Sequence, residues 1–222
     1  MIKATLIDFM GSDLSVANAA RVSFGKKSVC EKTRFLDIGD WCGDIPVVND
    51  KDTKLIKYLA KHKHFSPFGH CFATFHIKAP IFVARQLVKH EYLRMNEISR
   101  RYVDSEPEFY VPDVWRGRAK DKKQGSDGVV ESVYGPLAQH AAIRAYEGLL
   151  KDGVAPEMAR IVLPQSMMTE WYWSGSMDAF ANMCALRLKE DTQYETRLVA
   201  QQIDTMMAGL FPVSWKALVH GG

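Results

Sequence analysis

The sequence predicts a compact α/β domain of the α+β type, in which helices pack against a modest sheet. Two patterns lead to this prediction. Residues 71–78 (CFATFHIK) alternate and are rich in aromatic rings, which is typical of a strand. From Glu131 onward the pattern is mostly helical, over 132–151, 155–174, 178–187 and 191–208. A chain of 222 residues can form one substantial core, so we expect a single domain over residues 1–222.

Two further helices are predicted in the N-terminal part. Apolar residues lie at helical spacing over 14–24, at Leu14, Ala17, Ala20 and Phe24, behind Ser12 and Asp13 as candidate caps. The stretch 52–70 begins as a helix whose inner face carries Leu55, Ile56 and Leu59. The segment 65–69 should end this helix, because Ser66 precedes a proline and such a residue avoids the α region.

The middle of the chain predicts one helix and one loop. Pro80 suits the first turn of a helix that runs to about Leu93, since its missing N–H would have no partner there. Residues 114–128 (VWRGRAKDKKQGSDG) are polar, basic and spaced by glycines, which is typical of a surface loop.

Composition excludes several classes of protein. No run of eighteen apolar residues occurs, so we expect no membrane span. The N-terminal segment carries acids where a signal peptide needs apolar residues, and the four cysteines lie far apart, so a reducing cytoplasm is expected. A net charge of +3 permits an anionic small-molecule ligand and is weak for a nucleic-acid-binding protein.

The stretch RQLVKHEYLRMNEISRRY (85–102) concentrates cations where the chain enters its predicted core. Arg85 and Lys89 lie four residues apart and would be neighbours on a helix, so a bound anion would relieve their repulsion. Asn96, Glu97, Ser99 and Arg101 should gather near the end of the same helix, and such groups can complete a phosphate site. The alternative is a solvated helix face with surface ion pairs.

The segment KHEYLRMNEIS (89–99) resembles the signature of flavin-dependent thymidylate synthases, which is Arg-His-Arg, seven residues, then Ser. The spacing from His90 to Ser99 is kept. Further similar segments occur in the same order at 10–24, 61–86, 106–112, 159–173 and 182–195. The resemblance therefore covers most of the chain.

This resemblance implies an α/β fold that assembles as a homotetramer, with active sites where subunits meet. It implies reductive methylation of dUMP to dTMP, with methylenetetrahydrofolate as carbon donor, FAD as hydride source and NADPH as reductant of the flavin. It also implies that no cysteine acts as nucleophile. The residues agree, because Cys71 and Cys184 lie in apolar surroundings and are read as core filling.

Site residues follow from the resemblance by position. Arg187 corresponds to the arginine that promotes ionisation of the uracil ring, although pairing with Glu190 or Glu195 is the alternative from the residues alone. The implied dUMP contacts are Gln86, Lys89, Ser99, Arg101, Arg160 and Arg187. The implied FAD contacts are Ser23, His64, Ser66, Lys89, His90, Glu91, Arg94, Asn96, Glu97, Ser176 and Asn182. No metal site is implied.

The chain departs from the family pattern inside the motif. Lys89 stands for the first arginine, and Glu91 reverses the charge of the second. We expect Arg94 to pair with Glu91 as an i,i+3 neighbour and to replace the missing arginine. Gly69 stands where the family has a glutamate, and Ser176 where it has an asparagine. Two functions remain open: thymidylate synthase, or a related flavin- and folate-dependent hydroxymethylase of a deoxypyrimidine monophosphate.

Overall fold

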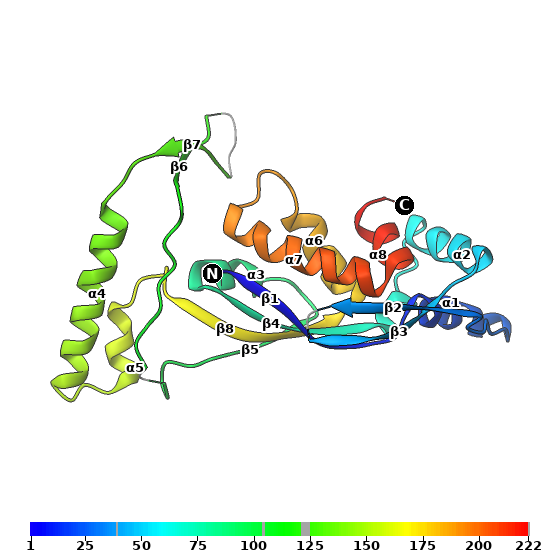
Figure 1. Cartoon of the computed structure of the whole chain (residues 1–222), viewed down its shortest axis with the longest axis horizontal. Helices are drawn as coiled ribbons and strands as arrows, with labels where there is room; N and C mark the ends of the chain where they lie inside the picture. Colours follow the sequence, from blue (N-terminus) through cyan, green and yellow to red (C-terminus); the bar gives the residue numbers. More distant parts are fainter. Residues whose placement is uncertain (39, 104, 121–124, 222) are drawn as a thin grey trace.

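The computed structural model describes residues 1–38, 40–103, 105–120 and 125–221. Its centre is a four-stranded antiparallel sheet with the strand order β1-β4-β8-β5 (Figure 1). The four strands are β1 (Lys3–Met10), β4 (Phe72–Pro80), β8 (Met168–Ser176) and β5 (Leu93–Glu97). The strand predicted over 71–78 is therefore confirmed as β4.

One face of this sheet is covered and the other is open. Along β4, Ala73, Phe75 and Ile77 are buried, whereas His76 and Lys78 on the opposite face are partly exposed. Three helices lie along the covered face in Figure 1: α6 (Met177–Arg187), α7 (Tyr194–Leu210) and α8 (Pro212–Val219). In the part of the chain that the structure describes, no helix covers the opposite face. Helices on one side of an antiparallel sheet define an α+β fold, so the predicted class is confirmed.

Aromatic side chains fill the space between the sheet and the helices. Trp173 of β8 and Phe75 of β4 are fully buried and pack edge-to-face on Phe180 of α6, with ring centroids 5.4 and 5.1 Å apart. Burial of each such ring contributes roughly 1.5–3 kcal/mol. Aromatic packing therefore fixes α6, and with it the position of Arg187 at the helix end.

The N-terminal elements form one end of the molecule. Helix α1 (Asp13–Arg21) begins behind Ser12, whose side chain caps it as predicted; Ser15, which was not predicted, completes the capping box, and Asp13 is the first residue of the helix. Phe24, expected on the inner face, is 78% exposed, because the α-helix ends at Arg21 and a 3-10 turn, η1 (Val22–Phe24), follows. The hairpin β2 (Lys32–Ile38) and β3 (Trp41–Val47) comes next.

The buried face of helix α2 (Asp50–Lys61) was predicted correctly, but its C-terminal end was not. Ile56 and Leu59 are buried as expected. The helix ends at Lys61, before Ser66, and Lys63 has a positive φ of 58°. A 3-10 turn, η2 (Phe68–His70), then leads into β4.

The helix predicted from Pro80 to about Leu93 is too long. Helix α3 (Ile81–Leu87) ends early, the chain turns, and β5 begins at Leu93. The reason is a period of two: Leu93 and Met95 pack against the core, whereas Arg94 and Asn96 are exposed. This register places Leu93 opposite Gly175 of β8.

Two other sequence predictions are wrong in part. The helix expected over 155–174 is limited to α5 (Pro156–Ala159) and a 3-10 turn, η3 (Arg160–Val162), and β8 follows. The loop expected over 114–128 contains β6 (Trp115–Arg118) and β7 (Ser126–Val130), which pair with each other, while residues 121–124 lie outside the described residues.

The helices expected over 132–151, 178–187 and 191–208 are confirmed as α4 (Tyr134–Lys151), α6 and α7, whereas α8 was not predicted. In Figure 1, β6, β7, α4 and α5 extend from one end of the sheet as an arm. The arm returns to the sheet through η3 and β8, which carry residues of the site described below.

Candidate active site

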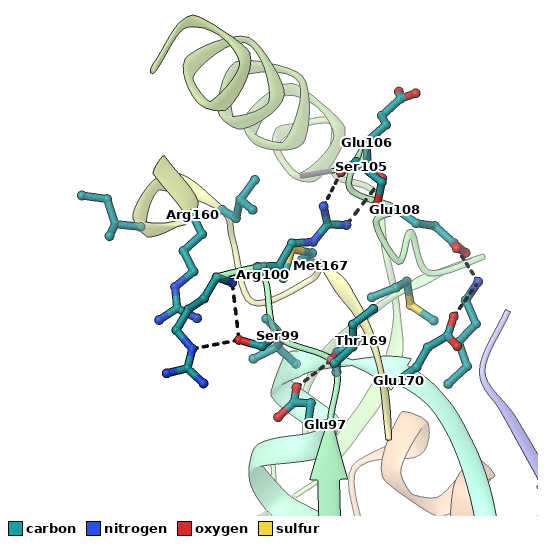
Figure 2. Close-up of a pocket in the computed structure, with 17 residues that line it drawn as sticks. Glu97, Ser99, Arg100, Ser105, Glu106, Glu108, Arg160, Met167, Thr169 and Glu170 are labelled. Carbon is teal, nitrogen blue, oxygen red and sulfur yellow. Dashed lines mark hydrogen bonds and ion pairs between the residues drawn. The ribbon is translucent and has the colours of Figure 1, made fainter. Parts of the chain in front are cut away.

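A pocket of about 720 Å³ opens at the Met168 end of β8. Figure 2 shows Ser99 entering it from the segment after β5, and Arg160 from the helical segment on the other side. Arg101 also lines this pocket, and its Nε donates a hydrogen bond of 3.0 Å to Ser99 Oγ. Glu97 accepts a hydrogen bond of 2.6 Å from the Thr169 hydroxyl (Figure 2).

Some of the cationic side chains in this pocket have partners that hold them, and others have no acidic partner. Lys78 is neutralised by Glu108 and Glu170, and the Arg100 guanidinium is held by two backbone carbonyl oxygens (Figure 2). Within the described residues, no carboxylate lies at ion-pair distance from Arg101 or Arg160. Two guanidinium groups without acidic partners, next to a serine hydroxyl, make a site suited to a phosphate group.

A second group of predicted residues surrounds Arg187 at the C-terminal end of α6. Its Nε donates a hydrogen bond of 3.0 Å to His90 Nε2, and one terminal nitrogen donates to the carbonyl oxygen of Gln86 at 3.2 Å. The Gln86 side chain in turn accepts a hydrogen bond of 3.2 Å from Thr196 on α7. Arg187 is therefore held by uncharged partners, and the alternative pairing with Glu190 or Glu195 does not occur among the described contacts.

His90 is neutral in this arrangement. Burial, and then the nearby charge of Arg187, lower the pKa of His90 to about 4 from 6.5. A neutral imidazole can accept the Arg187 hydrogen bond, whereas an imidazolium cannot. Burial also lowers the pKa of Arg187, yet a guanidinium stays protonated in proteins. The site therefore holds a positive charge beside a neutral base.

A second pocket of about 570 Å³ lies between α1 and α2 and contains Ser23, His64 and Ser66. The ring of Tyr58 stacks on His64, with centroids 6.3 Å apart and planes 15° apart. Hydroxyl groups, an imidazole and an aromatic ring in one pocket suit the ribityl and ring parts of a flavin.

Arg21 lines the same pocket, and we did not select it from the sequence. Its Nε and one terminal nitrogen both donate to Asp52 Oδ1, at 2.8 and 2.6 Å, and Asp52 is fully buried. Only a weak feature of the sequence pointed to Arg21: it is a cation two residues before Ser23, within the segment 10–24 that resembles the family.

The residues that depart from the family signature lie on the surface. Lys89 and Glu91 are exposed in the turn between α3 and β5, where Tyr92 has a φ of 62°, and Arg94 is exposed on β5 opposite Ser174. The predicted pairing of Glu91 with Arg94 is wrong, because α3 ends before either residue and the described residues form no such ion pair.

Strand β5 separates the two halves of the signature. Leu93 pairs with Gly175 and Glu97 pairs with Trp171, so the chain runs along β8 from Lys89 towards Ser99. The prediction that Asn96, Glu97, Ser99 and Arg101 gather at one helix end is therefore wrong. Asn96 is exposed on the strand, and the other three line the pocket at its far end.

Two further predicted residues lie outside both pockets. Ser176 is the last residue of β8 and the residue before α6, and Asn182 is exposed on α6. Strands β4 and β8 pair from Phe72–Ser176 to Pro80–Met168, which spans about 26 Å at roughly 3.3 Å per residue. The pocket that contains Ser99, Arg101 and Arg160 (the anion pocket) is at the Met168 end. The pocket that contains Ser23, His64 and Ser66 (the Ser23 pocket) is near the other end, so one chain does not bring all predicted residues together.

No cysteine lines either pocket, although Cys30 and Cys42 are exposed. Cys71 and Cys184 are fully buried, and burial raises the pKa of Cys71 to about 12 and that of Cys184 well above its ordinary value. The described side chains contain no group of three His, Cys, Asp or Glu residues arranged to bind a metal. None of the described helices has the length and hydrophobicity needed to span a membrane.

Comparison with known proteins gives consistent matches over nearly the whole chain. The chain is 39% identical over 218 residues to a flavin-dependent thymidylate synthase of Thermus thermophilus, a match that covers 96% of this chain and 73% of the relative. It is 37% identical over 222 residues to the enzyme of the same name from Kosmotoga olearia, covering 97% and 89%.

A solved structure has the same fold. The UMP/dUMP methylase PolB from Streptomyces cacaoi, bound with 5-Br dUMP, superposes with a TM-score of 0.80 at 30% sequence identity. The match covers 99% of this chain and 95% of that one.

The fold and the pockets define an α+β protein with an arginine-lined pocket suited to an anion and with no cysteine in the lining of either pocket. The family model described as thymidylate synthase complementing protein matches residues 5–213. The chain belongs to this family.

Proposed function

We propose that this chain is a flavin-dependent thymidylate synthase, which methylates dUMP to dTMP with methylenetetrahydrofolate, FAD and NADPH. The observation that carries the proposal is the pocket in which Arg101 and Arg160 lack acidic partners among the described residues, beside the Ser99 hydroxyl. Family membership and the names of the relatives support the same reaction. The name of the structural neighbour, a UMP/dUMP methylase, supports the nucleotide.

In this proposal the anion pocket binds the phosphate of dUMP. Guanidinium groups form paired, charge-assisted hydrogen bonds with phosphate oxygens, and the hydroxyl of Ser99 adds one more. Arg101 is already oriented by its hydrogen bond to Ser99, so little conformational entropy is lost when the phosphate binds. Arg160 enters from η3, after the arm, which makes the position of that segment important for nucleotide affinity.

Arg187 acts on the uracil ring. As a permanent cation it cannot remove a proton, but it stabilises the negative charge that develops when the ring is activated. Its partners Gln86 and His90 leave that charge uncompensated, because both are neutral. A carboxylate in their place would cancel the charge before the substrate could use it.

The residues of the Ser23 pocket fit part of a flavin cofactor. Ser23, Ser66 and His64 would hold it by hydrogen bonds, and Lys26 in the same pocket suits its phosphates, whereas the charge of Arg21 is balanced by Asp52. When bound, FAD supplies the hydride that completes the methyl group. The 570 Å³ pocket is small for a dinucleotide, which needs contacts beyond it.

A second copy of the chain would supply those contacts, and we include a homotetramer in the proposal. The two pockets of one chain lie at opposite ends of β4 and β8, so a nucleotide in one does not reach a flavin in the other. The open sheet face exposes Phe72 and Tyr172, at 43% and 52%, which gives an apolar surface for such contact.

We also propose that the protein is cytoplasmic and that folate is a further partner. Neither nucleic acid nor a membrane has a role in this proposal. Hydroxymethylation of the nucleotide is less supported, because the relatives are named synthases and the structural neighbour a methylase.

The test is product analysis with variants of the anion pocket. Purified protein with FAD, NADPH, methylenetetrahydrofolate and dUMP should form dTMP, identified by mass. Arg101→Ala and Arg160→Ala should each raise the KM for dUMP by about 10- to 100-fold, since each removes charged hydrogen bonds to the phosphate. Arg144→Ala, at an exposed position of α4, is the matched control and should leave KM unchanged. Absence of dTMP, or an unchanged KM in both pocket variants, would contradict the proposal.

A further inference from the structure

Arg187 is held by the protein through one of its two hydrogen-bonding edges. A guanidinium has a side edge, formed by Nε–H and an N–H of Nη2, and an end edge, formed by N–H groups of Nη1 and Nη2. Nε of Arg187 donates to His90 Nε2 at 3.0 Å, and Nη2 donates to the carbonyl oxygen of Gln86 at 3.2 Å. Gln86 and His90 lie four residues apart at the C-terminal end of α3, so the side edge of Arg187 faces this helix end.

The end edge of Arg187 is left for a ligand. Arg187 is partly exposed, and within the described residues no hydrogen bond reaches its Nη1. Arg21 shows the contrasting case, because Nε and Nη2 of its side edge both donate to Asp52, whose carboxylate balances the charge. The side edge of Arg187 is occupied by uncharged acceptors instead. Its end edge therefore presents two parallel N–H donors that carry the full positive charge.

Two parallel donors recognise two adjacent acceptors, as arginine does with O6 and N7 of guanine in DNA. A neutral uracil ring lacks such a pair, because the donor N3–H lies between its two carbonyl oxygens. Once the N3 proton has passed to water, N3 and a neighbouring oxygen form the pair. His90 does not take this proton, since its Nε2 accepts from Arg187 and its Nδ1 carries the ring proton. A cytosine ring presents the pair O2 and N3 without any ionisation.

We propose that His90 is a positioning residue that restricts Arg187 to its end edge, and that this edge lets the nucleotide site bind dCMP in competition with dUMP. The inference rests on the proposed function, which places the uracil ring at Arg187. Cytosine meets the two donors as a neutral ring, through O2 and N3. Uracil meets them after its N3 proton has left, and the positive charge of Arg187 favours that loss.

Calorimetric titration of the FAD-loaded full chain with dUMP, dCMP and N3-methyl-dUMP tests the edge. Titrations in two buffers of different ionisation enthalpy, at one pH, count the protons released on binding. We expect dUMP to release more protons than dCMP, which shares its phosphate and sugar. N3-methyl-dUMP should bind at least about tenfold more weakly than dUMP, because the methyl group removes an acceptor for a charged donor. In steady-state assays dCMP should raise the apparent KM for dUMP and leave kcat unchanged.

Three variants test the positioning role. His90→Leu removes the acceptor of the Arg187 Nε–H and should weaken dCMP binding by about tenfold or more. His90→Gln should restore wild-type affinity, because its amide oxygen accepts the same hydrogen bond. Arg187→Lys keeps the charge, removes the pair of parallel donors, and should also weaken dCMP binding by about tenfold or more.

Controls separate positioning from a general structural effect. Binding of 2-deoxyribose 5-phosphate, which lacks the base, should be the same in all three variants and the wild type. Flavin content is checked by absorbance and folding by circular dichroism. His140→Leu, at an exposed position of α4, is the matched control and should bind dCMP as the wild type does.

Four results would overturn the inference. These are no competition by dCMP at millimolar concentration, equal binding of N3-methyl-dUMP and dUMP, equal proton release with dUMP and dCMP, or wild-type dCMP affinity in flavin-loaded His90→Leu. If dUMP is methylated and dCMP does not compete, this inference fails and the proposed function stands. If dUMP itself neither binds nor reacts, both fail together.

Discussion

The neutral state of His90 should make the stability of this fold depend on pH. The pKa of His90 in the folded chain is about 4, below the ordinary value of 6.5. The unfolded chain therefore takes up a proton between these values that the folded chain does not. The contribution of His90 to stability is fully present above about pH 6.5 and is lost as pH falls towards 4.

The size of this effect follows from the difference in pKa. A difference of about 2.5 units corresponds to about 3.4 kcal/mol, at about 1.36 kcal/mol per unit. His90 is partly exposed, and solvent screening reduces this figure to roughly half. Between pH 7 and pH 5 the loss should be about 1–2 kcal/mol in the free energy of unfolding.

Urea unfolding of the wild type and of His90→Gln measures this contribution. The amide oxygen of glutamine can still accept the hydrogen bond from Arg187, but it does not titrate. The wild type should therefore lose about 1–2 kcal/mol more than the variant between pH 7 and pH 5. His140→Gln, at an exposed position of α4, controls for the loss of a histidine elsewhere. Equal pH dependence of wild type and His90→Gln, or an NMR titration of His90 near pH 6.5, would refute the reasoning.

Four other substitutions, one of them a control, test other parts of the structure. Gly175→Ala should lower the free energy of unfolding by about 1–3 kcal/mol in urea, because a Cβ there would stand 2.4 Å from Leu93 Cδ2. Gly148→Ala in α4, where nothing lies within 4 Å, should be neutral or stabilising by up to about 1 kcal/mol, so equal effects would rule out the steric explanation. Asp52→Ala should cost about 3 kcal/mol in the same assay, since it leaves a partly buried guanidinium without its partner; a cost below about 1 kcal/mol would contradict this. Cys71→Ala should retain dTMP formation, because a buried thiol with a pKa of about 12 is not a nucleophile, and complete loss in a folded variant would show otherwise.

The elements with one clear period could be predicted from the sequence. Strand β4 was found because buried Phe75 and Ile77 alternate with polar neighbours, and α2 because Ile56 and Leu59 share a face. Strand β8 was missed because the exposed residue between its two buried tryptophans is also aromatic, Tyr172, so no alternation is visible. Strand β5 is short, and its alternation is too brief to be separated from the helix before it.

The candidate site was predictable only through the family resemblance. Spacing alone does not indicate that Arg160 faces Ser99, because the whole arm separates them in the chain. Local reasoning placed Glu97 and Arg101 at a helix end, when a strand carries the chain away from it. The hydrogen bond between Arg187 and His90 depends on the packing of α6 against the sheet, which no short stretch of sequence encodes.

The position of β5 explains why the signature is defined by a distance as well as by residue types. Strand β5 fixes the distance between His90 and Ser99, and its register on β8 determines the position of Ser99. Inserting or deleting one residue in 93–97 would turn every following side chain of the strand to the opposite face. Lys89 and Glu91 lie outside the strand, in the exposed turn before it, so their side chains do not set its register.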